Sequence, residues 1–107
     1  MKLIVAIVNN EDSRTVQAEI TKAGYQVTKL STSGGFLRAG NVTFLCGVDD
    51  EKVGDVVEII NEFSRNRRQT IHPTATFAAE ALLSAPIEVT VGGATVFVLD
   101  VEQFYKL

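Results

Sequence analysis

The chain is poor in the residues on which disulfide-rich, metal-binding and many catalytic proteins depend. Its 107 residues include one cysteine, one histidine and no tryptophan. A single cysteine excludes an internal disulfide framework, and because Cys46 lies within an apolar run we expect a buried thiol. No group of His, Cys and carboxylate residues has the spacing of a metal site. We therefore expect no metal, no cofactor and no catalysis.

The sequence also lacks an excess of positive charge and a long hydrophobic run. A net charge of −3 argues against a surface that binds nucleic acid. No stretch approaches the roughly 20 apolar residues of a membrane span. The first short apolar run is followed by Glu11 and Asp12, which is unlike a signal peptide. We expect a cytoplasmic protein without a membrane span, folded as a single domain over residues 1–107.

What the chain does have is an alternation of strand and helix patterns. Residues 1–8 are almost continuously apolar, which is typical of a central strand buried on both faces. Period-two patterns predict further strands, with Gly92 and Gly93 as a tight hairpin turn between the last two. These further strands are expected at residues 25–30, 42–48, 87–91 and 94–99.

Two helices are predicted between the strands. The first is capped by Asp12 or Ser13 and ends at Lys22, just before Gly24. The second begins at Asp49 or Asp50 and carries an apolar stripe at helical spacing. This stripe comprises Val53, Val56, Val57, Ile60 and Phe63.

The remaining segments give weaker patterns. Residues 66–85 are interpreted as a long loop whose Ala-rich part forms a helical turn. Residues 101–105 are interpreted as a short closing helix. Three arginines that follow the second predicted helix are interpreted as its solvated end, because cations favour helix C-termini. These cations are Arg65, Arg67 and Arg68.

The order β-α-β-β-α-β, with an extra terminal strand, predicts an α+β, ferredoxin-like fold. Two helices would cover one face of an antiparallel sheet. Because the strands carry apolar residues on both sides, the other face also needs cover. We expect this cover to come from self-association into a closed homo-oligomer, most simply a homotrimer.

The glycine-rich stretch at residues 32–41 has groups suited to a nucleotide. Gly34 and Gly35 can turn their amides toward a phosphate, and Phe36 offers a flat face to a base. Asn41 supplies a donor and an acceptor, while Thr28 and Arg38 offer a hydroxyl and a charge. The alternative is that Phe36 and its neighbour Leu37 pack on the sheet, and that the glycines only turn the chain.

Several segments are similar to one known family when taken together. They are residues 2–8, residues 27–41 with the motif TSGGFLRAGN, residues 43–48, and VGGATVFV at residues 91–98. In these segments the chain resembles the cyclic-di-AMP receptor family of PII-like signal-transduction proteins. The resemblance implies a trimeric ferredoxin-like fold that binds cyclic-di-AMP in clefts between subunits and has no catalytic activity.

The resemblance also implies a set of ligand-contacting positions. They are Thr28, Gly35, Phe36, Leu37, Asn41 and Gly47, with Gly92 and Gly93 in the matching second glycine turn. One departure is Gln26, which stands where the family has a ligand-contacting arginine and cannot form a bidentate fork. A second departure lies at residues 74–85, which are shorter and richer in Ala and Leu than the family pattern.

Two alternatives follow from the residues. With Gln26 in place of arginine, the pocket would prefer ATP or AMP, or bind no ligand and serve as a protein-interaction module. An enzyme is the other alternative, supported only by analogy with ferredoxin-like enzymes. Its candidate polar residues are Tyr25, His72 and Tyr105.

Overall fold

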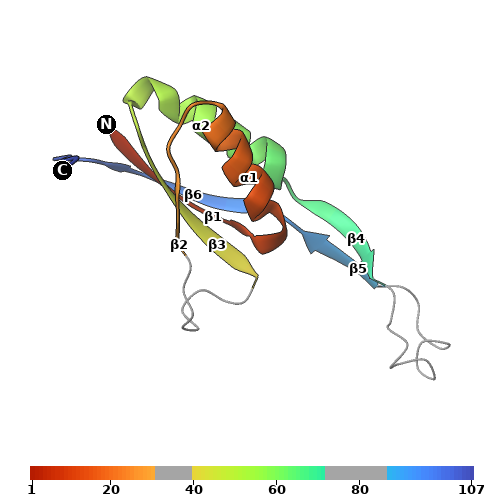
Figure 1. The fold of residues 1–107 in the computed structure, drawn as a ribbon. Coiled ribbons are helices and arrows are strands. Elements are labelled where there is room, and N and C mark those ends of the chain that lie inside the picture. The colour runs from red at the N-terminus through yellow and green to blue at the C-terminus, as the bar shows by residue number, and fades with distance from the viewer. Residues whose placement is uncertain (31–39, 72–86) are drawn as a thin grey trace.

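The computed structural model describes residues 1–30, 40–71 and 87–107. The elements are β1 (Lys2–Asn9), α1 (Asn10–Lys22), β2 (Thr28–Leu30), β3 (Asn41–Val48), a 3-10 turn (Asp50–Lys52), α2 (Val53–Ser64), β4 (Arg67–Ile71), β5 (Ile87–Val91) and β6 (Ala94–Asp100). Both helices lie together on one face of the main sheet, and the ribbon of β4 and β5 extends away from one end of it (Figure 1). This ribbon is called the arm below.

The main sheet has four strands in the order β2-β3-β1-β6, and every neighbouring pair is antiparallel. The central strand β1 pairs with β3 from Lys2↔Val48 to Asn9↔Asn41, and with β6 from Lys2↔Asp100 to Val8↔Ala94. The predicted α+β class, with two helices on one face of an antiparallel sheet, is confirmed. The strand order is compatible with the ferredoxin-like fold.

The core lies between the sheet and the helices. Alternate residues of β1 and β3 face the helices, and Phe44 is the largest of those that are fully buried. Val56 and Ile60 of the predicted stripe are buried against them. Cys46 is buried as expected, and its burial raises the pKa of the thiol.

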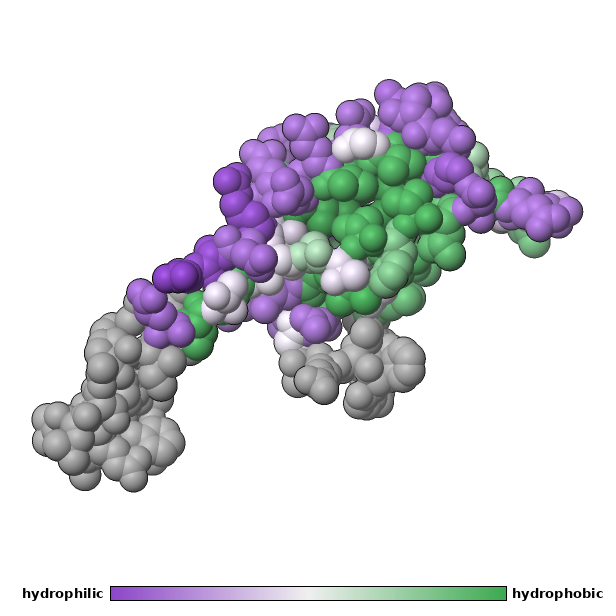
Figure 2. Space-filling view, turned by 180° about the vertical axis from the view of Figure 1, so that it is seen from behind, coloured by the Kyte–Doolittle hydropathy of each residue, from purple (hydrophilic) through white to green (hydrophobic). Residues whose placement is uncertain are grey.

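The other side of the sheet, called the open face below, is also apolar. Its apolar residues are Leu3, Val5, Ile7, Leu45, Phe97 and Leu99, which the strand register places on the side opposite the helices. Phe97 is 54% exposed and Leu99 48% exposed, and no described element covers them. Seen from behind, the body of the molecule carries a broad hydrophobic area (Figure 2). The expectation of strands with two apolar sides is confirmed.

The arm corrects two predictions. Residues 66–85 were expected to be a loop, but Arg67–Ile71 form β4, which pairs with β5 from Arg67↔Val91 to Ile71↔Ile87. The polar sequence of β4 has no apolar alternation of its own, so its strand form depends on pairing with the apolar β5. The hairpin predicted at Gly92 and Gly93 is wrong, because β5 pairs with β4 whereas β6 pairs with β1. These glycines instead connect two sheets.

Smaller corrections concern the ends of the helices. α1 begins at Asn10, ahead of the predicted caps Asp12 and Ser13, because the Asn9 side-chain oxygen accepts a hydrogen bond from the Glu11 amide at 2.9 Å. The 3-10 turn after Asp49 confirms that the second helical segment starts there.

The C-terminal half differs in two further ways. The helix predicted at residues 101–105 is wrong. The Val101 amide donates to the Met1 carbonyl at 3.2 Å, which extends the antiparallel pairing of β1 and β6 by one hydrogen bond. Arg65 does lie at the end of α2, but Arg67 and Arg68 belong to β4 and not to a solvated helix end. The predicted Ala-rich turn and His72 lie outside the described residues. None of the described helices is long and apolar enough to cross a membrane.

Candidate ligand site

Three predicted ligand residues meet in one hollow of about 330 Å³ at the end of the sheet nearest the arm. Asn41 is the first residue of β3, and Gly92 and Gly93 approach it from the connection between β5 and β6. The strand register places Asn9 opposite Asn41, and Asn66 enters from the chain that leaves α2. The hollow is completed by Ile7, Val8, Ala94 and Thr95.

The hollow is rich in neutral hydrogen-bonding groups. The amides of Asn9, Asn41 and Asn66 each offer two donors and one acceptor, which suits the edge of a base or a phosphate oxygen. The oxygen of Asn9 already accepts from Glu11, but its NH₂ group is not used by that bond. Recognition of a polar, planar ligand is therefore possible here without a charged side chain.

Gly92 and Gly93 are required by both conformation and space. Their φ angles are +87° and +85°, in the left-handed region that favours glycine. A Cβ atom on Gly92 would lie 2.7 Å from the Arg65 carbonyl oxygen and 2.7 Å from Arg67 Nη1. On Gly93 it would collide with the side-chain oxygen of Asn66. The wall of the hollow is thus packed directly against the base of the arm.

A second group of predicted residues lies toward the other end of β3. Thr28 pairs with Leu45, and Gly47 lies two residues further along the strand; both are exposed, as is Gln26. Gly47 is six residues from Asn41, about 20 Å at roughly 3.3 Å per residue. Within one copy of the chain, the two groups are therefore separate, although the register places Thr28, Asn41 and Gly47 all on the open face. Gly35, Phe36, Leu37 and Arg38 lie outside the described residues.

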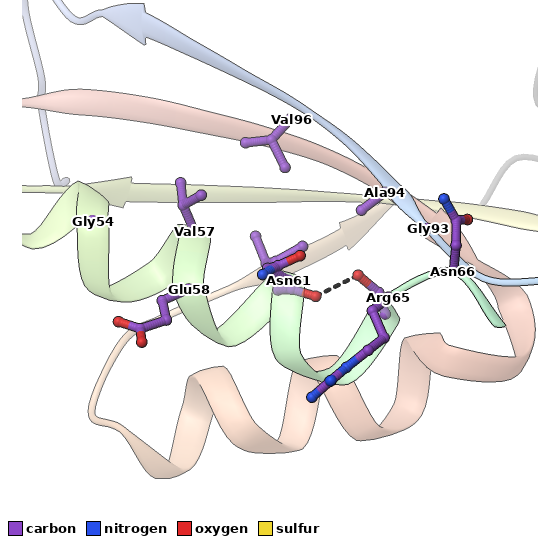
Figure 3. Close-up of a pocket in the computed structure, with 11 residues that line it drawn as sticks. Gly54, Val57, Glu58, Asn61, Arg65, Asn66, Gly93, Ala94 and Val96 are labelled. Carbon is purple, nitrogen blue, oxygen red and sulfur yellow. Dashed lines mark hydrogen bonds between the residues drawn. The ribbon is translucent and has the colours of Figure 1, made fainter.

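A larger hollow of about 560 Å³ lies between α2 and β6 and was not expected from the sequence. Figure 3 shows Glu58, Asn61 and Arg65 on the helix side and Val96 on the strand side. Asn66 and Gly93 line this hollow as well as the first one, so the two hollows meet there. Nothing in the sequence identified Asn66 as a residue of the site. Asn9 can be identified once the register of β1 and β3 is known, because it pairs with Asn41.

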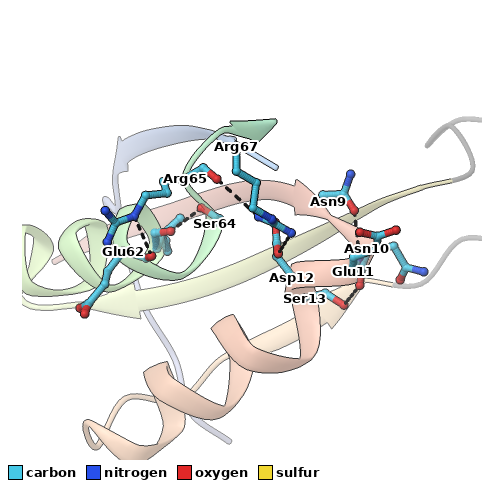
Figure 4. A network of polar contacts seen from close by, with 10 residues as sticks. Asn9, Asn10, Glu11, Asp12, Ser13, Glu62, Ser64, Arg65 and Arg67 are labelled. Atoms are coloured by element: carbon cyan, nitrogen blue, oxygen red, sulfur yellow. Dashed lines mark hydrogen bonds and ion pairs between the residues drawn. The ribbon is translucent and has the colours of Figure 1, made fainter. Parts of the chain in front are cut away.

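A polar network ties the base of the arm to both helices (Figure 4). Arg67 donates two hydrogen bonds to the buried carboxylate of Asp12, at 2.8 and 3.3 Å, and this contact raises the pKa of the guanidinium. The Gly93 amide donates to the Ser64 carbonyl, and the Ser64 hydroxyl donates to the Ile60 carbonyl. The link between Asp12 and Arg67 spans 55 residues, so no local pattern could have predicted it.

Two of the three residues considered for catalysis, Tyr25 and Tyr105, lie in the described part of the chain. Tyr25 donates to Asp55 at 3.2 Å, and both burial and Asp55 raise the pKa of its phenol, which keeps it protonated. Tyr105 is exposed on the C-terminal segment, and neither tyrosine lines the first hollow. Among the described residues, no group of three or more His, Cys, Asp or Glu side chains is placed to hold a metal ion.

The fold and the hollow together define a small α+β protein whose candidate site is built from backbone glycines and side-chain amides, as in a binding protein. The family model of the cyclic-di-AMP receptors matches residues 1–107, and the chain belongs to this family. Membership supports cyclic-di-AMP as the ligand and indicates a receptor rather than an enzyme. The chain is also similar to a crystal structure of a functionally unknown protein from Pediococcus pentosaceus ATCC 25745. The TM-score is 0.78 at 40% identity, over 99% of this chain and 96% of that chain.

Proposed function

We propose that this protein is a PII-like signal-transduction receptor that binds cyclic-di-AMP in clefts between the subunits of a homotrimer. One observation carries the proposal: Asn41, Gly92 and Gly93 meet in one hollow, while Thr28 and Gly47 lie toward the opposite end of the open face. A compact ligand contacts both groups when they come from two neighbouring copies. Packing open faces together would also cover their exposed apolar residues.

The groups in the hollow match the chemistry of a cyclic dinucleotide. Asn41 and Asn66 provide donor and acceptor pairs for an adenine edge, and the glycine backbone permits close approach of a phosphate. From a neighbouring copy, Thr28 would add a hydroxyl for the second phosphate. Phe36 is expected to stack on a base, which contributes about 1–3 kcal/mol per base.

Binding is further proposed to change the conformation of residues 33–40 and 66–85 and so control a protein partner. The support is positional. Asn66 and Gly92, which line the hollow, immediately precede and follow the two strands of the arm. A ligand that prefers one arrangement of these residues shifts the arm toward that arrangement. A docking surface for a partner would thereby depend on ligand concentration.

The direct test is calorimetric titration of the purified protein with cyclic-di-AMP, with cyclic-di-GMP and ATP as controls. We expect selective binding of cyclic-di-AMP near one ligand per subunit. Selective binding of ATP or AMP would instead favour the mononucleotide receptor. Absence of binding for all of these ligands would favour a protein-interaction module without a ligand.

The substitution Gln26→Arg tests whether the pocket is intact but weakened. Gln26 is exposed beside the Thr28 group, so an arginine there can reach a phosphate without disturbing the core. We expect affinity for cyclic-di-AMP to rise about tenfold, because a charge-assisted bidentate contact replaces a neutral one. Gln103→Arg adds the same charge on the exposed C-terminal segment and serves as the matched control in the same titration. Equal gains for both variants would show only a general attraction between charges.

A further inference from the structure

The ion pair between Asp12 and Arg67 holds the base of the arm against the helical layer. Asp12 lies in the first turn of α1 and is only 7% exposed, whereas Arg67 is the first residue of β4. The two hydrogen bonds of the pair, at 2.8 and 3.3 Å, form the fork geometry that only arginine provides. If Arg67 were removed, the negative charge of the buried Asp12 carboxylate would have no positive partner, which is unfavourable for a buried charge.

The same guanidinium also contacts the wall of the candidate site. Arg67 Nη1 lies 3.4 Å from the Arg65 carbonyl oxygen and 2.7 Å from the position that a Cβ atom on Gly92 would take. Arg67 directly follows Asn66, another residue of the hollow. The pair therefore fixes the chain on both sides of the hollow, at Asn66 and at Gly92.

We propose that Asp12 and Arg67 are positioning residues for ligand binding, since their ion pair holds Asn66 and Gly92 in the arrangement that the ligand requires. This inference rests on the proposed binding of cyclic-di-AMP at that hollow. Without the pair, the base of the arm samples other positions. The apparent affinity for the ligand is then reduced by the fraction of molecules in which the arm occupies the position that can bind. Neither residue needs to touch the ligand.

The test compares Arg67→Gln and Asp12→Asn with wild-type protein by calorimetric titration, at a temperature where each variant is folded. We expect each single variant to bind cyclic-di-AMP about tenfold more weakly, and the double variant to bind no more weakly than either single one. Arg68→Gln is the matched control: it removes the same charge from the next residue of β4, which is 79% exposed and pairs only loosely with Glu88 at 3.6 Å. It should bind like wild type. Arg67→Lys keeps the charge without the fork and should show a smaller loss.

Hydrogen exchange on the ligand-free proteins separates this inference from the proposed function. In Arg67→Gln, amides of β4 and β5 should exchange faster while those of β1 and β3 stay protected. Unchanged exchange in the arm, unchanged affinity, or additive losses in the double variant would overturn the positioning role. If the arm loosens but wild-type protein binds no cyclic-di-AMP, the proposed function fails while the hold of the pair on the arm stands. If Arg67→Gln does not fold, Arg67→Lys carries both measurements.

Discussion

Phe97→Asp is expected to break the proposed homotrimer into monomers and to abolish the proposed binding of cyclic-di-AMP at the same time. Phe97 lies on the open face, opposite Val5 of the central strand, and is 54% exposed in the single copy. Burial of a phenylalanine stabilises an interface by about 1.5–3 kcal/mol, and a carboxylate buried there without a partner costs several kcal/mol more. In a closed ring of identical subunits, this loss of binding free energy would occur at every interface between subunits.

Sedimentation or light scattering gives the mass, and calorimetry on the same samples gives the affinity. Val98→Asp is the matched control, because Val98 is the next residue, is 46% exposed, and lies on the helix side of the sheet opposite Ile4. It should leave the proposed homotrimer intact and bind cyclic-di-AMP like wild type. The proposal of a site between subunits is contradicted if Phe97→Asp is monomeric and still binds cyclic-di-AMP with wild-type affinity.

Most of the main sheet was predictable because its strands carry strong local patterns, although β2 covers only Thr28–Leu30 of the strand predicted at residues 25–30. The apolar run of β1, the alternation of β3 and the stripe of α2 each favour one structure over a whole element. Of the arm, β5 was predicted at residues 87–91, but β4 was not, since it has the sequence RRQTI and becomes a strand only through pairing with β5. An error there caused a second error at Gly92 and Gly93, where two adjacent strands were assumed to pair with each other.

The residues of the candidate site also divide into those that sequence motifs identified and those that only the tertiary fold revealed. Asn41, Gly92 and Gly93 were identified from motifs, and the structure brings them together. Asn9 and Asn66 were missed, because their place in the hollow depends on strand register and on the direction in which the chain leaves α2. The pairing of Asp12 with Arg67 was missed for a related reason: both are common surface residue types, and only the tertiary fold buries the carboxylate.

Gly92→Ala is expected to destabilise the protein by about 2–4 kcal/mol and to weaken binding of cyclic-di-AMP by more than tenfold. A left-handed backbone costs an alanine about 1–2 kcal/mol, and φ here is +87°. The added Cβ also meets the Arg65 carbonyl oxygen and Arg67 Nη1, both at 2.7 Å. Relief of that contact displaces either the backbone of the hollow or the guanidinium that pairs with Asp12. Chemical denaturation measures the first effect and calorimetry the second.

Gly24→Ala separates the two causes. Gly24 also has a positive φ, +98°, but nothing lies within 4 Å of the position that its Cβ would take. This variant should lose only the conformational part, about 1–2 kcal/mol, and should bind the ligand like wild type. Equal losses of stability in the two variants would mean that the packing around Gly92 adjusts freely. Unchanged affinity of Gly92→Ala for cyclic-di-AMP would contradict the proposal that the glycine backbone lines the ligand site. The loss of binding expected of Gly92→Ala, and not of Gly24→Ala, follows from the close contact between the hollow and the base of the arm. Of these two positions, Gly92 is the one at which an added methyl group meets that contact.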